Sequence, residues 1–300
     1  MFKRKFIAII LLLFLVFVGC SSQTTPEDLP KGIFYEVSGG QSTMYLFGSI
    51  HAGYEDMYPL VDSVESAFEN SETLVLEMDL VNIDQSELIG VVMEYGFYSD
   101  GDRLSNHVSE ETITKILDLI GPDYVDRASL ESIKPWYAAQ IVTQIAMDET
   151  SFSVDDGVDI YFLSKAADKK IIGLETATDQ FKPFSLLSSE SEVIFLEETL
   201  AEISELETGL DELLRFWHDG DYDAVANLRN EMMQDAPTPS YKAYQDAFLN
   251  ERDANMAVKL DELLKDEGNY FVVVGYLHLA GDNSIPVLLE EMGYTVTPLS

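Results

Sequence analysis

One short pattern occurs near both ends of the chain and constrains its fold more than any other feature. In each copy an apolar, β-prone run ends at a glycine, and a histidine follows three residues later. The first copy is 45–48 with His51, and the second is 271–275 with His278. Such runs indicate buried strands, and glycine lets the backbone turn where a side chain would clash. The chain is therefore expected to present two imidazoles on loops at the ends of two buried strands.

Each copy is followed by a helical pattern and then by a further strand. In the first half these elements are 58–70 and 73–77, and in the second half they are 284–292 and 293–297. The periodicity changes from that of a strand to that of a helix and back again in both halves. The two ends of the chain are therefore expected to form two related halves of one sheet.

The segment between these halves, about 85–265, has a mostly helical pattern that is interrupted by one strand at 170–174. Together the patterns predict an α/β fold, with a central mixed sheet from two related halves and a largely helical insertion. The 300 residues can bury one substantial core, and 31–300 is expected to be one domain. The other expected elements are a hairpin of 33–37 and 43–47, and helices over 110–120, 130–147, 158–167, 190–207, 210–218, 222–233 and 241–264.

Two more strands end in a carboxylate, at Glu77 and at Glu175. Ligands of open α/β sheets bind at the carboxyl ends of the strands. If the four strands share a sheet, both glutamates are expected to meet His51 and His278 at that edge. Imidazole and carboxylate groups bind Zn, Mn, Co and Fe, and such a metal can turn a bound water into a nucleophile.

Two alternatives remain open for these residues. The histidines could make ordinary hydrogen bonds in the core, and the glutamates could cap helices or pair with a buried arginine, Arg252. The other two histidines, His107 and His218, are expected to be structural or exposed, because neither follows a strand that ends in glycine.

The charge balance argues against several classes of partner. The chain has 54 acidic and 18 basic residues, a formal net charge of −36. A nucleic-acid-binding protein needs clustered Lys and Arg, so no nucleic acid is expected, and an electrostatic hold on anionic lipid is also disfavoured. Cys20 is the single cysteine, so neither a disulfide framework nor a second thiol for catalysis is available.

The amino terminus has the features of a targeting segment. Basic residues 3–5 precede the apolar stretch 6–18, which is shorter than the roughly 20 residues of a membrane-spanning helix. Residues 17–20 resemble a bacterial lipobox, although an ordinary cleaved signal with an incidental cysteine is the alternative. We therefore expect a lipoprotein signal peptide at 1–19, an acylated Cys20, a polar tether at 20–30, and an extracytoplasmic domain that the lipid anchors to a bacterial membrane.

The chain resembles a known family over nearly all of this domain. The resemblance rests on Leu46–His51, Leu76-Glu77, Lys134-Pro135-Trp136, Gly157-Val158-Asp159, Gly173–Thr176 with Gln180, Glu251–Met256, Val274–Gly281 and Gly293–Val296. Together these motifs are similar to those of the TraB/GumN family, which is related to the Tiki-type membrane metalloproteases and to a haem-uptake lipoprotein group.

The resemblance implies an active-site cleft built from both Gly-x-x-His loops, the strand-end glutamates and Arg252. It also implies a metal-dependent peptidase that uses Mn or Co, and Zn is a further candidate on chemical grounds. His51 and His278 are expected to hold the metal with one glutamate, while the other glutamate acts as general base. Arg252 is expected to stabilise the oxyanion or grip a substrate carboxylate.

The family pattern places Asp159 near the cleft, where it is expected to orient a histidine from behind. The predicted function is thus a membrane-anchored, extracytoplasmic metal-dependent hydrolase that acts on a peptide or small-molecule substrate. The alternative is a surface lipoprotein that binds a peptide or small ligand without catalysis, with Arg252 paired to a ligand carboxylate.

Overall fold

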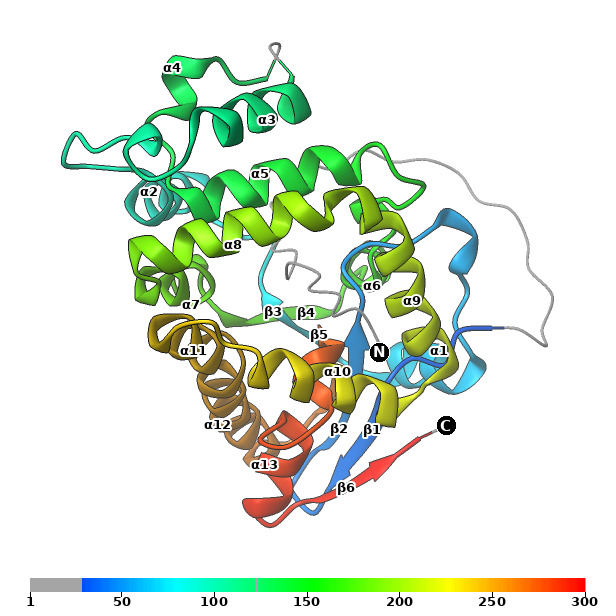
Figure 1. Cartoon of the computed structure of the whole chain (residues 1–300). Coiled ribbons are helices and arrows are strands. Elements are labelled where there is room, and N and C mark those ends of the chain that lie inside the picture. Colours follow the sequence, from blue (N-terminus) through cyan, green and yellow to red (C-terminus); the bar gives the residue numbers. More distant parts are fainter. Residues whose placement is uncertain (1–28, 122–123, 300) are drawn as a thin grey trace.

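The computed structural model describes residues 29–121 and 124–299. Its centre is a six-stranded mixed sheet in the order β4-β3-β5-β2-β1-β6 (Figure 1). Only β1 runs antiparallel to its neighbours, so the other five strands point the same way. The predicted α/β fold, with a mixed sheet built from both ends of the chain, is confirmed. The strands are β1 (Phe34–Ser38), β2 (Thr43–Ser49), β3 (Thr73–Met78), β4 (Lys170–Glu175), β5 (Asn269–Gly275) and β6 (Thr295–Pro298).

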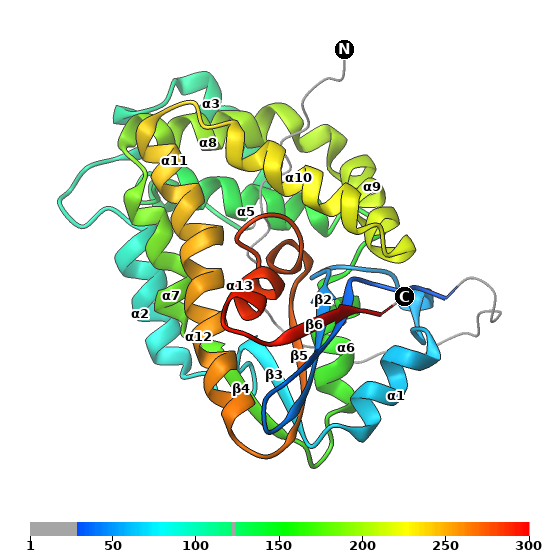
Figure 2. The same ribbon diagram turned by 90° about the horizontal axis from the view of Figure 1, so that it is seen from below.

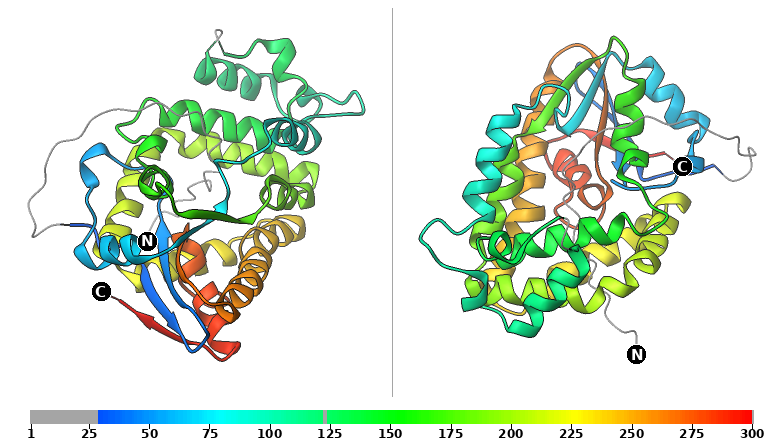
Figure 3. Two further views of the ribbon diagram at one scale, coloured as in Figure 1. Left: turned by 180° about the vertical axis from the view of Figure 1, so that it is seen from behind. Right: turned by 90° about the horizontal axis from the view of Figure 1, so that it is seen from above.

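Helices surround this sheet on three sides. In Figure 2, α1 and α6 lie on one face of the strands, and α12 and α13 lie on the other. Figures 1 and 3 show α5 and α8 running across the end of the sheet toward which the parallel strands point. The helices are α1 (Asp62–Asn70), α2 (Gln85–Gly96), α3 (Glu110–Ile120), α4 (Arg127–Leu130), α5 (Pro135–Met147), α6 (Val158–Lys165), α7 (Ala177–Phe181), α8 (Ser189–Glu202), α9 (Leu206–Asp219), α10 (Tyr222–Gln234), α11 (Pro239–Asp246), α12 (Arg252–Lys265) and α13 (Ile285–Glu291).

The central strand, β5, is buried on both faces and paired along both edges. It pairs with β2 on one side and β3 on the other, and its residues from Tyr270 to Val274 are all buried. A strand covered on both faces and both edges reads as a continuous apolar run, which is what 270–274 shows. Phe271 contacts the rings of Phe47 and Phe162 in the core of the sheet.

The inserted helices have a hydrophobic core of their own. Trp136 of α5 is fully buried there and stacks on Phe184, with ring centroids 4.0 Å apart. Leu277, from the second histidine loop, contacts this core and the core of the sheet. The helical layer is therefore packed directly over the carboxyl edge of the strands.

Some helix boundaries differ from the sequence expectation for identifiable reasons. The helix expected at 130–147 is divided, because α4 ends at Leu130 and α5 begins at Pro135, a residue that favours the first helical position. The helix expected at 241–264 contains the π-turn η6 (Ala247–Glu251). In the described part of the chain, no helix combines the length and apolar character needed to cross a membrane. The predicted signal peptide, Cys20 and most of the tether lie outside the described residues.

One buried carboxyl group predicts how stability depends on pH. Glu192 on α8 is 8 % exposed, and burial raises its pKa to about 7 although Lys134 and His107 oppose the shift. The folded protein therefore binds this proton more tightly than the unfolded chain does. The stability that this bound proton contributes to the folded state is lost as pH rises from 4.5, the usual pKa of the group, through 7.

We predict that Glu192→Gln raises the free energy of unfolding at pH 8 by up to about 3 kcal/mol and changes it little at pH 4. Urea unfolding at the two pH values measures this difference. Glu197→Gln, at an exposed position of the same helix, is the matched control. An equal effect of both substitutions at pH 8 would contradict the assignment.

Candidate functional site

The predicted site residues converge at the carboxyl edge of the sheet. The strands β4, β3, β5 and β2 are adjacent and parallel there. They end in Glu175, Glu77, the loop of His278 and the loop of His51, in that order along the edge. The Nε2 atoms of His51 and His278 lie 4.0 Å and 3.7 Å from the same oxygen, Oε1 of Glu77. The predicted proximity of the two histidines is confirmed.

The first histidine is held from behind by α6. His51 Nδ1 lies 3.0 Å from Asp159 Oδ1, and the Ser49 hydroxyl donates to the same oxygen at 2.7 Å. Gly157 makes this approach possible, because a side chain there would lie within 2.7 Å of the His51 carbonyl oxygen. The Gly157-Val158-Asp159 motif therefore fixes the ring, and Nε2 is left facing the site.

The second histidine is held in the same way by α12. His278 lies on the 3-10 turn η7 (Tyr276–Leu279), and its Nδ1 contacts Oδ1 of Asp253. Its side chain is 6 % exposed, whereas that of His51 is 37 % exposed. One imidazole is thus enclosed by protein, while the other reaches the surface.

Glu77 is the common neighbour of both rings. Its Oε1 accepts a hydrogen bond from the Gly275 N–H at 2.6 Å, and its Oε2 accepts one from Arg252 at 2.7 Å. Burial raises the pKa of Glu77, but the Arg252 guanidinium, the two imidazoles and the Gly275 N–H outweigh it and bring the pKa to about 2. Glu77 is therefore ionised near neutral pH, which suits a ligand for a cation better than a proton acceptor.

Arg252 ties the two glutamates together. Its Nε and Nη2 bind both oxygens of Glu175, at 2.7 Å and 2.6 Å, and Nη2 also binds Glu77. Nη1 donates to the Phe248 carbonyl oxygen, which lies in the π-turn η6. The pairing that was the alternative interpretation of Glu77 and Glu175 is thus present. Four hydrogen bonds occupy most of the five N–H donors of a guanidinium. This favours a positioning role for Arg252, while its direct role with substrate stays a prediction.

The formal charges of the site do not balance without a further contribution. Four carboxylates (Glu77, Glu175, Asp159 and Asp253) face two guanidinium groups (Arg252 and Arg229). Two positive charges are missing, and either two protonated imidazoles or one divalent cation can supply them. Burial lowers the pKa of His51, but Asp159 and Glu77 outweigh it and raise the pKa to about 9. The site therefore attracts positive charge.

Three donors have the chemistry of metal ligands and lie near one another. Atoms within ~2.1 Å of one ion lie at most about 4.2 Å apart, and the Nε2–Oε1 distances of 3.7 Å and 4.0 Å meet this limit. A Cβ on Gly275 would lie 3.2 Å from Glu77 Oε1 and 3.3 Å from His51 Nε2, so this glycine keeps the space between them open. As the side chains stand, no group of three or more His, Cys, Asp or Glu among residues 29–121 and 124–299 is placed to hold a metal ion. The donor types nonetheless suit a divalent ion, and binding one would require these side chains to move closer together.

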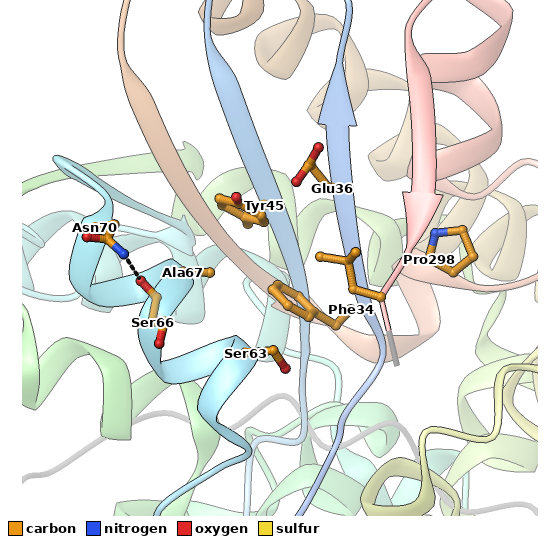
Figure 4. A pocket seen from close by; sticks show the side chains of 9 residues that line it. Phe34, Glu36, Tyr45, Ser63, Ser66, Ala67, Asn70 and Pro298 are labelled. Carbon is orange, nitrogen blue, oxygen red and sulfur yellow. Dashed lines mark hydrogen bonds between the residues drawn. The ribbon is translucent and has the colours of Figure 1, made fainter.

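A hollow elsewhere on the surface lacks this chemistry. It has a volume of about 500 Å³ and lies between α1 and the strands β1 and β6, as Figure 4 shows. None of the predicted site residues lines it, and Glu36 is its single charged lining group. The candidate site is therefore the cluster at the carboxyl edge of the sheet.

Sequence reasoning did not identify every residue that shapes this site. It assigned no role to Asp253, Ser49 or Arg229, although Asp253 stands next to Arg252 and Ser49 lies inside the first Gly-x-x-His motif. Their position next to or inside these motifs is the one sequence signal that could have indicated Asp253 and Ser49. Arg229 has no such signal, because it comes from α10 in the insertion.

We predict that Glu175→Gln destabilises the protein by about 3 kcal/mol, because it removes one partner of a buried ion pair. Urea unfolding measures the loss. The matched control is Glu110→Gln, which breaks the exposed pair of Glu110 with Arg127 and is expected to have a much smaller effect. Equal losses of unfolding free energy in the two variants would show that the buried ion pair contributes no more to stability than the exposed one.

Comparisons with known proteins identify relatives of the chain. An uncharacterized protein of Treponema pallidum is 21% identical, over 91% of this chain and 86% of its own length. The uncharacterized protein YbaP of Escherichia coli is 25% identical, over 84% of this chain and 89% of its own length. No solved structure gives a significant match. The model of the TraB/PrgY/gumN family matches residues 33–298, and the chain belongs to this family.

Proposed function

We propose that this chain is a metal-dependent hydrolase that cleaves peptide bonds, with a divalent ion held by His51, His278 and Glu77. The observation that carries the proposal is the convergence of two imidazole Nε2 atoms and one carboxylate oxygen beside Gly275. Mn, Co and Zn all suit a set of two nitrogens and one oxygen.

The groups behind the histidines support this assignment. In metal sites, a ligating histidine usually donates a hydrogen bond from its other ring N–H, often to a carboxylate. This bond fixes the orientation of the ring and makes the ligand more basic. Asp159 stands in that position behind His51, and Asp253 stands there behind His278. Both Nε2 atoms consequently face Glu77.

When bound, a metal ion here supplies a Lewis acid and lowers the pKa of a coordinated water. Glu77 is held as a ligand by the Gly275 N–H and by Arg252. Glu175 is assigned as general base, which requires one of its oxygens to leave Arg252 and accept a proton. The family resemblance, together with the partly exposed His51, supports a peptide as the substrate.

A non-catalytic ligand-binding protein is the second candidate. It is favoured by the electrostatics of His51, because the pKa of this imidazole is raised to about 9 and its protonated form supplies positive charge to the site without any metal. Protein that is free of metal and still binds a peptide or small ligand would support this candidate.

The activity test is a peptide-library cleavage assay in which Mn, Co and Zn are supplied in turn. We expect cleavage to require metal and to be lost in His51→Ala and Glu77→Gln, whereas His218→Ala, at a histidine that is not among the proposed ligands, retains it. Activity that survives His51→Ala would refute the mechanism.

A steric variant tests metal binding separately. Gly275→Ala places a methyl group between the donors, and we predict at least a tenfold loss of metal affinity, measured by calorimetry, with an unchanged melting temperature. Undiminished affinity would mean that the metal lies elsewhere.

We further propose that the protein is a lipoprotein anchored outside the bacterial cytoplasmic membrane through acylated Cys20. The support is the basic segment, the short apolar stretch and the lipobox-like residues 17–20. We predict that Cys20→Ala releases the protein from the membrane fraction or leaves its precursor unprocessed. Fractionation with immunoblotting measures this, with Ser21→Ala as the control. An unchanged distribution of Cys20→Ala would contradict the lipid anchor.

A further inference from the structure

Arg229 is a buried cation that the helical insertion brings to the sheet. It lies on α10 and is 1 % exposed. Gly281, in a left-handed conformation with φ of 84°, leaves room for it, because a Cβ there would be 3.2 Å from Arg229 Cδ. A guanidinium is rarely buried unless its donors are satisfied, so its partners indicate what it does.

These partners all belong to the surroundings of His278. Nη1 donates to the carbonyl oxygen of Leu277 at 2.7 Å, and Nη2 donates to Asn250 Oδ1 at 2.9 Å. Nη2 also lies 2.7 Å from Asp253 Oδ2. One guanidinium therefore joins the histidine turn η7, the π-turn η6 and the first turn of α12.

Asp253 depends on this contact. Its side chain is 0 % exposed, with Oδ1 on His278 Nδ1 and Oδ2 beside Arg229. No aligned hydrogen bond from a described residue reaches Oδ2, so the contact with Arg229 is chiefly electrostatic. A buried carboxylate that loses its cation is strongly disfavoured. Without Arg229, Asp253 is expected to move, and His278 then loses its fixed orientation.

Among residues 29–121 and 124–299, no Lys or Arg forms an ion pair with Asp159, the carboxylate next to His51. Asp159, which orients His51, receives the hydroxyl of Ser49 on the same oxygen. His278 is thus enclosed and its carboxylate partner faces a buried guanidinium, whereas His51 is partly exposed and its carboxylate partner accepts from a hydroxyl. This asymmetry makes His278 the fixed ligand of the pair.

We propose that Arg229 is a positioning residue for His278 and acts through Asp253. The effect on metal affinity rests on the proposed function, but the orientation of the imidazole does not. Arg229 makes the helical insertion part of the site, because α10 supplies the cation next to Asp253, the carboxylate that holds His278.

The test uses the full chain labelled with nitrogen-15, and histidine side-chain NMR reports the tautomer of each ring without any metal. We expect one His278 form, protonated at Nδ1, in the unchanged protein. In Arg229→Met we expect a shifted or mixed His278 signal, an unchanged His51 signal, and Mn or Zn affinity lower by about 10- to 100-fold. Arg229→Lys keeps the charge and is expected to restore part of the effect. Arg215→Met, at an exposed arginine of α9, is the control.

A double variant keeps the proposal testable if Arg229→Met folds poorly. Arg229→Met with Asp253→Asn removes both charges, so the cost of an unpaired buried ion disappears. If Arg229 acts through Asp253, adding Arg229→Met to Asp253→Asn leaves the His278 signal unmoved and changes metal affinity by less than about twofold. The effects of the two substitutions are then non-additive. Additive effects, or a His278 signal unmoved by Arg229→Met, would overturn the proposal. If the unchanged protein binds no metal, the proposed function fails while the NMR result still decides the role of Arg229.

Discussion

The buried guanidinium of Arg252 is the interaction on which the arrangement of the site depends. It binds Glu175 at the end of β4 and Glu77 at the end of β3, two neighbouring parallel strands. Two carboxylates so close together repel each other unless a cation lies between them. With Arg252 in place, Glu77 can stay ionised and turn its second oxygen toward the histidines. The contact also fastens α12 to the sheet, so the packing of that helix and the electrostatics of the site depend on the same side chain.

The π-turn before α12 explains how one helix serves both halves of the site. Arg252 and Asp253 are consecutive, so they point about 100° apart around the helix. Arg252 reaches the glutamates, and Asp253 reaches His278. A π-turn adds one residue to a helical turn, and the Phe248 carbonyl oxygen in this turn accepts a hydrogen bond from Arg252. Such turns are frequent at functional sites, and here the turn sets the rotation that both contacts require.

The sequence predicted the parts of this site that follow from local patterns. The apolar runs, their terminal glycines and the residues just beyond them were enough to place His51, Glu77, Glu175 and His278 at one edge of the sheet. Periodicity could not show that β5 lies between β2 and β3, because strand order depends on how distant segments pack. It also could not show the π-turn, which changes the helical register by one residue. The role of Arg229 could not be predicted either, because its partners lie in η7, η6 and α12, which only the packing of distant segments brings together.

The pairing of β2 with β5 has a consequence for how the molecule folds. Thr43 pairs with Asn269 and Ser49 with Gly275, so more than two hundred residues separate partners in the middle of the sheet. Closing so long a loop is slow, and until β5 arrives the edges of β2 and β3 remain unpaired. A chain that stops before β5 lacks His278 and cannot complete the histidine pair. During synthesis, the nascent chain therefore lacks the complete site, and it needs protection from aggregation until its last strands are available.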